Sequence, residues 1–186
     1  DVGVMYIVLS AYHNYLNNKP LKFDSLINYN INLLQSADSV AKIAPTADTL
    51  DGIYIPKDFQ DALIHLDKII SKESKEQMLK NNDIKDATIA EHFGVGFRIR
   101  NMWKLWGNSR LSIYLQPYCF YNADRMSTLI LYGYYLKLHN KPHSLDIVFT
   151  YYIDNLKKEG YYESYLETKE QYLEDQRKLQ ERKNSK

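Results

Sequence analysis

The fold of this chain is decided by residues 87–106, which read ATIAEHFGVGFRIRNMWKLW. This stretch is the least polar long segment of the sequence, it holds both tryptophans, and it contains no proline. If the stretch forms one helix at about 100° per residue, its apolar side chains fall on two separate arcs. The larger arc holds Val95, Ile99, Met102 and Trp106, with His92, Gly96 and Trp103 beside it, and the second arc holds Phe93 and Phe97. Because a helix that is apolar on two sides is normally covered by its neighbours, the stretch predicts a central, Trp-bearing helix.

Length and charge limit the class of protein. The 186 residues suffice for one domain, or for a domain with a helical appendage. Lys and Arg together number 24 and Asp and Glu number 23, so there is no basic excess to attract nucleic acid. Tyrosine is unusually common, at 17 residues. Its ring can be buried while its hydroxyl reaches water, so it suits both the edge of a core and a contact surface. We therefore expect no nucleic-acid partner, and tyrosines that serve the core in preference to a binding face.

The N-terminus and the single cysteine bear on location. Residues 2–9 are apolar but too few to span a bilayer, and neither a basic segment nor an initiating Met precedes them. This start does not read as an intact signal peptide. Cys119 stands alone, which rules out an intrachain disulfide. The sequence predicts no membrane span and favours the cytoplasm, with an exported form left open.

Residues that start and stop helices divide the rest of the chain into short segments. No stretch shows the sustained alternation of apolar and polar residues that is typical of a strand. Gly107 is expected to end the central helix, and Pro117 to stop the helix that follows it. The small and polar residues 36–51 are the best candidate for a linker. The sequence thus predicts an all-α fold, an irregular multi-helix bundle around the central helix. The expected helices span residues 2–17, 24–34, 56–70, 71–82, 87–106, 109–115, 126–138, 144–153 and 160–186.

Three helix starts have alternative caps. The central helix can be capped by Asp83 or Asp86, and the helix at 126–138 by Asn122 or Asp124. The helix at 144–153 can begin at Ser144 or Asp146. All three pairs stay open at the level of the sequence.

The predicted helices group into three parts. They are an N-terminal hairpin at 1–38, a main helical domain at 53–158 and a charged C-terminal helix at 160–186. In the long C-terminal helix, Tyr165, Tyr172 and Leu179 recur every seven residues. A narrow stripe of this kind is a docking seam, either on the chain's own body or on a partner. We take these three residues as a candidate partner surface.

The N-terminal hairpin echoes a later segment. Residues 7–34 align without a gap on residues 129–156, with 10 identities in 28 positions. Both segments read as a helix, an Asn-Lys-Pro break and a second, capped helix. The general sequence preferences of helix ends explain why both segments have caps. They explain less well why both contain the full Asn-Lys-Pro with an Asp at the same distance after it. We predict a duplicated helical hairpin.

The usual catalytic and metal-binding patterns are missing. A lone histidine on an apolar arc, such as His92, is more often a hydrogen-bonded core residue than a ligand or a base. No second His or acid lies near it at metal-binding spacing, and no Gly-x-Ser-x-Gly elbow surrounds Ser127. We therefore predict no catalytic residue, no cofactor and no metal site. The candidate structural core contains Trp103, Trp106, Asp124 and Ser127.

A local cationic cluster has two interpretations. In the functional one, Arg100, Asn101 and Arg110, with His92 nearby, form an anion or ligand-binding pocket. In the structural one, the Arg100 guanidinium stacks on a ring and pairs with an acid. We favour the structural interpretation, because a buried arginine is usually paired. The acids available for pairing are Asp124, Asp67 and Asp86.

Several short motifs surround the central helix. They are Ile55-Pro56 with Leu66-Asp67, His92-Phe-Gly-Val-Gly96, Arg-Asn-x-Trp-x-Leu-Trp at 100–106, Ser109-Arg110-Leu111 and Asp124-x-Met126-Ser127. In these motifs residues 53–140 resemble a family of small, uncharacterised bacterial all-helical domains. The resemblance implies a bacterial origin, hence a bacterial cytoplasm for the favoured location, and an all-helical domain. More loosely, it implies a role among accessory proteins, such as immunity proteins of toxin systems. It carries no activity, so no catalytic residue is transferred.

These observations favour a non-catalytic, helical protein-binding protein, of the immunity or accessory type that the resemblance implies, which acts through a protein partner or by self-association. The alternative is a small-molecule or anion sensor, or an enzyme, at the neighbourhood of Arg100, Asn101, Arg110 and His92. A nucleic-acid binder is the least favoured class, because the net charge is +1.

Overall fold

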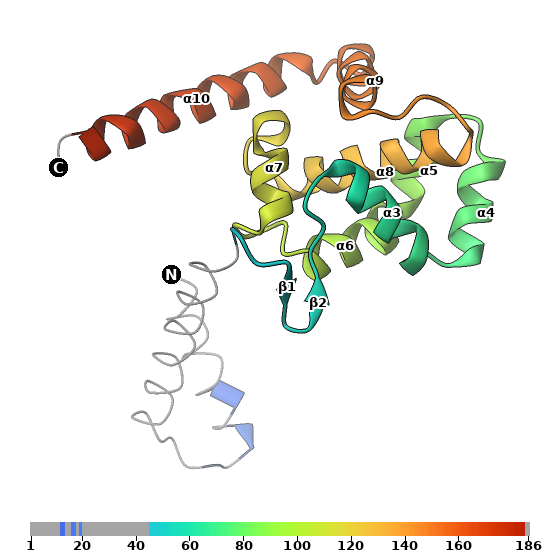
Figure 1. The fold of residues 1–186 in the computed structure, drawn as a ribbon, viewed down its shortest axis with the longest axis horizontal. Helices are drawn as coiled ribbons and strands as arrows, with labels where there is room; N and C mark the ends of the chain where they lie inside the picture. Colours follow the sequence, from blue (N-terminus) through green and yellow to red (C-terminus); the bar gives the residue numbers. More distant parts are fainter. Residues whose placement is uncertain (1–11, 14–15, 18, 20–44, 185–186) are drawn as a thin grey trace. The chain divides into compact units, whose positions relative to one another are not determined.

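The computed structural model describes residues 45–184 continuously, together with residues 12–13, 16–17 and 19. The chain separates into two compact units, Asp1–Ala44 and Pro45–Lys186. Apart from these five residues, the predicted N-terminal hairpin and the first copy of the predicted duplication lie outside the described residues. Figure 1 shows the elements of the second unit.

The second unit is built almost entirely of helices (Figure 1). Within the described residues the strands are β1 (Thr49–Leu50) and β2 (Ile53–Tyr54), which form one small antiparallel hairpin. The prediction of an all-α, multi-helix fold is therefore confirmed. In chain order the helices are α3 (Phe59–Ile69), α4 (Lys72–Lys80), α5 (Ile84–Glu91), the π-helical turn η1 (His92–Gly96), α6 (Phe97–Met102), α7 (Arg110–Cys119), α8 (Ala123–Leu138), α9 (Leu145–Lys158) and α10 (Tyr162–Asn184).

The small hairpin occupies the end of the predicted linker 36–51. Its two central residues, Asp51 and Gly52, have φ angles of 51° and 74°. Positive φ at both central positions is the signature of the tight turn whose twist matches two paired strands, and glycine reaches it without strain. A local turn signal thus produces a hairpin where the sequence suggested only a connection.

Helices begin where short polar side chains cap them. Asp83 Oδ1 accepts hydrogen bonds from the backbone N–H groups of Lys85 and Asp86, so Asp83 is the cap of α5. Asn122 accepts from the N–H of Arg125 and is the cap of α8. These bonds select one residue from each of these two pairs. Further caps of the same kind are Asp58, Ser71 and Ser109. In the third pair of alternatives Ser144 is the residue before α9, and its side chain makes no capping hydrogen bond.

The most thoroughly buried element is α8. All its residues from 129 to 136 are buried, and α8 contacts α3, α4, α5, α6, α7 and α9. It packs tightly against Phe59 of α3 at Gly133, where an added Cβ atom would lie 2.3 Å from Phe59 Cζ. The centre of the bundle is therefore α8, while the Trp-bearing stretch packs against it from one side.

The stretch 87–106 is not one regular helix. It passes from α5 through η1 into α6, and a π-helical turn shifts the register of every side chain that follows it. After Met102 the chain turns, with Lys104 at a φ of 50°. Trp103 and Leu105 are each 1% exposed, whereas Trp106 is 61% exposed. The expected core position of Trp106 is therefore wrong, because the helix has already ended and Leu105 faces inward in its place.

Helix α7 continues past the expected stop at Pro117 and ends at Cys119. A proline inside a helix removes one backbone hydrogen bond. The next bond is nevertheless made, since the N–H of Phe120 donates to the carbonyl of Gln116 at 2.8 Å. Leucine and cysteine side chains of this last turn are buried, and their burial offsets the lost bond.

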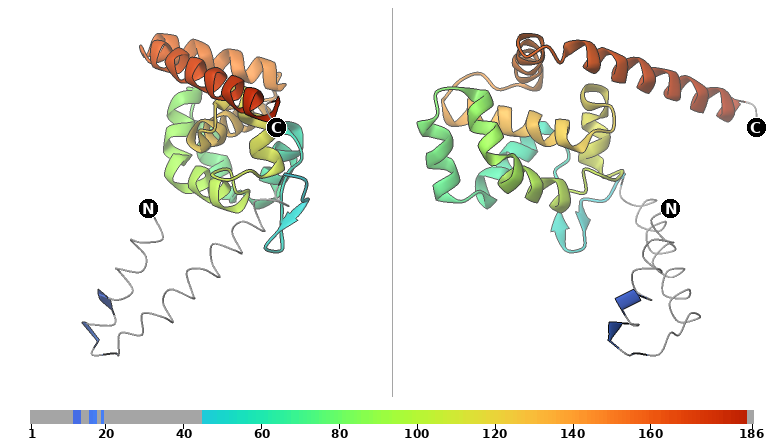
Figure 2. Two further views of the ribbon diagram at one scale, coloured as in Figure 1. Left: turned by 90° about the vertical axis from the view of Figure 1, so that its left-hand side faces the viewer. Right: turned by 180° about the vertical axis from the view of Figure 1, so that it is seen from behind.

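Helix α10 is attached to the unit through the aromatic side chains of its first half. The Tyr165 ring, 4% exposed, lies 5.1 Å from the Phe120 ring, and the Tyr172 ring lies 5.4 Å from Phe120 and 5.1 Å from Tyr121. Figure 2 shows the remainder of α10 running on past α7. The first two residues of the predicted seam therefore dock on the chain's own body, and Leu179, 46% exposed, lies beyond them.

In the part of the chain that the structure describes, no helix is both long enough and apolar enough to cross a membrane. This finding agrees with the prediction of no membrane-spanning helix.

Candidate functional site

Arg100 anchors a polar cluster between α6 and the start of α8. The residue is only 3% exposed, and its Nη1 donates to Ser127 Oγ at 2.8 Å. Its Nε lies 3.2 Å from Asp124 Oδ1, and its Nη2 donates to the backbone oxygen of His92 at 3.4 Å. Of the three acids available for pairing, the structure therefore selects Asp124. The guanidinium also lies 6.0 Å from the centroid of the Phe97 ring.

Two small features allow α6 to approach α8 so closely. A Cβ atom at Gly96 would lie 3.2 Å from Arg100 Nη1 and 3.4 Å from a Leu131 methyl group, so a larger residue would push the two helices apart. Ser127 turns its hydroxyl between the helices, donating to the carbonyl of Asp124 at 2.9 Å while it accepts from Arg100. Asp124 also lies in the first turn of α8, where the helix dipole favours a carboxylate. The charges of Arg100 and Asp124 are thus paired, although the buried Nε–H of Arg100 makes no hydrogen bond.

His92 lies at the outer edge of this cluster. Its Nε2 is 3.6 Å from Asp124 Oδ1, and the two side chains are 30% and 47% exposed. Its ring meets the Phe93 ring edge-on at 5.0 Å. The position is therefore half-buried and shared with solvent, which differs from the core position that the apolar arc suggested.

The other two residues of the predicted anion pocket lie in different surroundings. Arg110 Nε donates to the backbone oxygen of Ile55 at 2.8 Å, and its guanidinium lies 5.1 Å from the Tyr54 ring centroid. Asn101 is exposed, and its side chain donates to the carbonyl of Phe97 at 3.2 Å. The structure thus brings together His92 and Arg100, while Arg110 fastens the β-hairpin and Asn101 caps its own helix.

An uncovered apolar surface adjoins the polar cluster. Ile89, Phe93 and Phe97, spaced by four residues, are 56%, 84% and 56% exposed. We call these three residues the apolar face. The sequence placed both phenylalanines on a second arc and expected neighbours to cover it. In the second unit α8 covers only the opposite side of this segment, so the second arc faces outward.

Other chemistry has little support in the described residues. Among them no group of three or more His, Cys, Asp or Glu side chains is arranged to hold a metal ion. Cys119 is 1% exposed, and burial raises the pKa of its thiol far above the ordinary value, so it stays protonated and unreactive. Nucleophilic catalysis at this cysteine is therefore disfavoured.

Comparison with known proteins finds one family model that resembles part of the chain. Residues 55–138 match the family model described as Domain of unknown function (DUF6794). The matched segment runs from the end of β2 to the end of α8 and includes the polar cluster and the apolar face. The prediction of an uncharacterised domain family is thereby confirmed. No curated protein and no solved structure matches the chain.

Proposed function

We propose that this chain is a non-catalytic protein-binding module whose contact surface is the apolar face of Ile89, Phe93 and Phe97. The observation that carries the proposal is the exposure of these side chains, with Phe93 at 84%. Fully burying a side chain of this kind contributes about 1.5–3 kcal/mol, so a partner that covered all three would gain substantially. A chain with no use for such a surface would be expected to carry polar residues there.

The apolar face is held in place before any partner arrives. Its residues belong to α5, η1 and α6, and the pairing of Arg100 with Asp124 and Ser127 ties this segment to α8. A surface that is already ordered loses little conformational entropy on binding. Half-exposed polar groups of His92 and Asp124 lie at its edge, as the polar rim of an interface requires.

The spacing of the apolar face favours a helical partner. Side chains four residues apart form a ridge on a helix surface, and such ridges fit the grooves between the ridges of a second helix. We therefore propose that the partner protein presents an amphipathic helix, whose apolar stripe lies along the ridge of Ile89, Phe93 and Phe97. An immunity-type or accessory role is the specific form of this proposal that the family resemblance favours.

The alternative, a sensor or enzyme built on an anion pocket, has weaker support. Arg100 donates to Ser127 and to the backbone oxygen of His92, and its charge is paired with Asp124. Arg110 donates to the backbone oxygen of Ile55. An incoming anion would have to compete with these existing partners. The apolar face, in contrast, is covered by no described residue that would first have to move.

Photocrosslinking in the native host tests the proposal. We expect p-benzoylphenylalanine at position 93 or 97 to give one discrete covalent adduct with a second protein. The matched control places the same residue at Tyr161, which is aromatic and 64% exposed but lies outside the apolar face. A second copy of the chain as the captured protein would indicate self-association. Equal adducts at all three positions, or none at 93 and 97, would contradict the proposal.

A further inference from the structure

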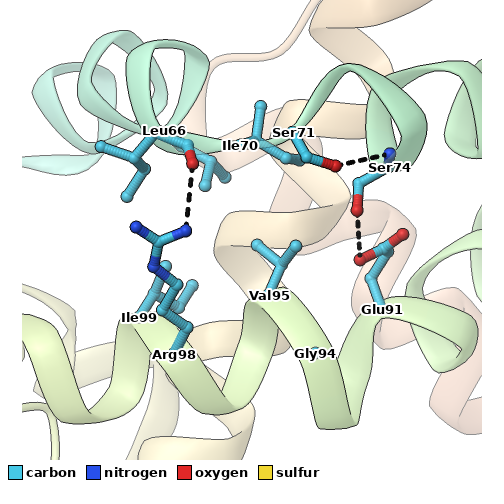
Figure 3. Close-up of a pocket in the computed structure, with 10 residues that line it drawn as sticks. Leu66, Ile70, Ser71, Ser74, Glu91, Gly94, Val95, Arg98 and Ile99 are labelled. Carbon is cyan, nitrogen blue, oxygen red and sulfur yellow. Dashed lines mark hydrogen bonds between the residues drawn. The ribbon is translucent and has the colours of Figure 1, made fainter.

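A cavity of about 200 Å³ lies between the end of α3, the start of α4 and the η1–α6 segment (Figure 3). Its walls are largely aliphatic, and Figure 3 shows Ile70 and Val95 facing one another across it. One water molecule occupies about 30 Å³ in the liquid. If each carbon or nitrogen atom takes a similar volume, the cavity accommodates roughly six such atoms. Glu91 and Arg98 supply charge at its two ends.

Glu91 is a buried acid without a cation. The residue is 5% exposed, and its Oε2 accepts one hydrogen bond, from Ser74 Oγ at 3.2 Å. Within the described part of the chain no Lys, Arg or His lies within ion-pair distance of this carboxylate. Arg98, the other charged group facing the cavity, donates to the backbone oxygen of Ile69 at 3.3 Å and lies at the far end from Glu91 in Figure 3. Burying a carboxylate without a counter-charge is costly.

The dipoles of the neighbouring helix ends do not fully compensate the charge of Glu91. Ser74 belongs to the first turn of α4, whose dipole supplies the equivalent of roughly half a positive charge and so compensates Glu91 only in part. The C-terminal end of α3 borders the cavity, and its dipole favours positive charge, which Arg98 supplies in part at the Ile69 carbonyl. A divalent metal ion fits poorly, because such ions take several oxygen ligands and Glu91 is the one carboxylate lining this cavity.

We propose that this cavity binds a primary ammonium group carried on a short aliphatic stem. The nitrogen pairs with the Glu91 carboxylate, and the stem lies along Ile70 and Val95. Gly94 lies beside the carboxylate, and a Cβ atom there would be in van der Waals contact with Glu91 Oε2 at 3.6 Å. The stem can belong to a free amine or to a lysine side chain of a partner protein. This site is distinct from the apolar face, and the proposal does not depend on the function proposed for that face.

The test is an NMR titration of the full chain with n-butylammonium chloride. We expect saturable shifts of the Ser74, Glu91 and Gly94 amides, and no such shifts with 1-butanol, which has the same stem without the charge. Glu91→Gln should weaken binding by about tenfold or more, because it removes the charge and keeps the shape. The control Glu76→Gln removes an exposed acid of α4 and should leave binding unchanged.

Gly94→Ala provides a second variant that is expected to fold. It adds a methyl group beside the carboxylate and raises helix propensity, so weaker binding cannot be attributed to unfolding. Absence of saturable binding to the wild-type chain would overturn the proposal, and so would equal binding to Glu91→Gln. Titration with Nα-acetyl-lysine amide separates the two sources of the ammonium group. Binding at least as tight as that of n-butylammonium assigns the site to a partner's lysine, and loss of binding assigns it to a free amine.

Discussion

Helix α8 and the α5–η1–α6 segment are both rich in apolar residues, but they occupy different positions. In α8 every residue from 129 to 136 is buried, and helices surround it on all sides. The α5–η1–α6 segment buries Ile99 and Trp103 but leaves Phe93 84% exposed. Apolar composition alone does not distinguish a helix that is enclosed from one that is half covered.

The difference between the two regions locates function. Surrounded by its neighbours, α8 supplies cohesion and offers nothing to a partner. The α5–η1–α6 segment gives one side to the core, where the Glu91 cavity lies between it and the ends of α3 and α4, and it keeps the apolar face on the other side. We therefore expect substitutions in α8 to act on stability, and substitutions on the outer side of the segment to act on binding.

The two tryptophans should give the largest contrast. Trp103→Ala is expected to lower the free energy of unfolding by about 3–5 kcal/mol, because it opens a cavity at a residue that is 1% exposed. Trp106→Ala, at a residue that is 61% exposed, should change it by less than about 0.5 kcal/mol. Urea denaturation of both variants measures these values. Similar losses for the two would mean that the segment is enclosed as α8 is.

Glycine substitutions should act in opposite directions in the two regions. Gly133→Ala in α8 is expected to destabilise the chain by about 1–3 kcal/mol, because the new methyl group would meet the Phe59 ring at 2.3 Å. Gly94→Ala, whose new Cβ would meet nothing closer than 3.6 Å, should stabilise it by up to about 1 kcal/mol. Thermal unfolding of the two variants distinguishes them. A stabilised Gly133→Ala would show that α3 and α8 pack less tightly than described.

The attachment of α3 to α8 should depend on pH. The Tyr134 hydroxyl, which donates to Asp67 Oδ1 at 2.7 Å, holds the pKa of that carboxyl below its ordinary value, and Lys75 and Lys137 act in the same direction. Because the folded-state pKa is lowered, the stabilisation is complete above the unfolded pKa of about 3.9 and is lost as pH falls through the folded pKa. The Asp67 side chain is 46% exposed, so screening limits the effect to about 1 kcal/mol or less.

Unfolding of wild type and Asp67→Asn at pH 7 and at pH 3 measures this effect. The difference in stability between the two proteins should shrink at the lower pH. Tyr134→Phe, which removes the donor but keeps the carboxylate, should lose most of the pH dependence. An equal difference at both pH values would contradict the assigned role of Asp67.

The smallest effect on stability is expected at the apolar face. Phe93→Gln and Phe97→Gln should each change the free energy of unfolding by less than about 0.5 kcal/mol, because more than half of each phenylalanine side chain is already exposed to solvent in the folded state. The same substitutions should abolish the crosslinked adduct at the neighbouring position. A large loss of stability in either variant would show that the face serves the fold instead of a partner.

Local features were predictable where one residue decides them. The caps at Asp83 and Asn122 were each among two alternatives, because a short polar side chain before an apolar run acts on backbone groups beside it. The partner of Arg100 was among three acids, since any of them could neutralise it. The π-helical turn η1 and the continuation of α7 past Pro117 were missed, because both depend on contacts with distant helices that offset a local cost.

The sequence by itself determined that this protein is helical, where most helices begin, and that residues 55–138 resemble an uncharacterised domain family. Tertiary structure alone decided which apolar helix is enclosed, where Trp106 points, and that Glu91 is buried beside a cavity. The physical reason is the range of the interactions. Caps, turns and periodicity act within a few residues of the backbone, whereas burial depends on which surfaces meet, and the chain folds α3, α4 and α8 around one side of the α5–η1–α6 segment only.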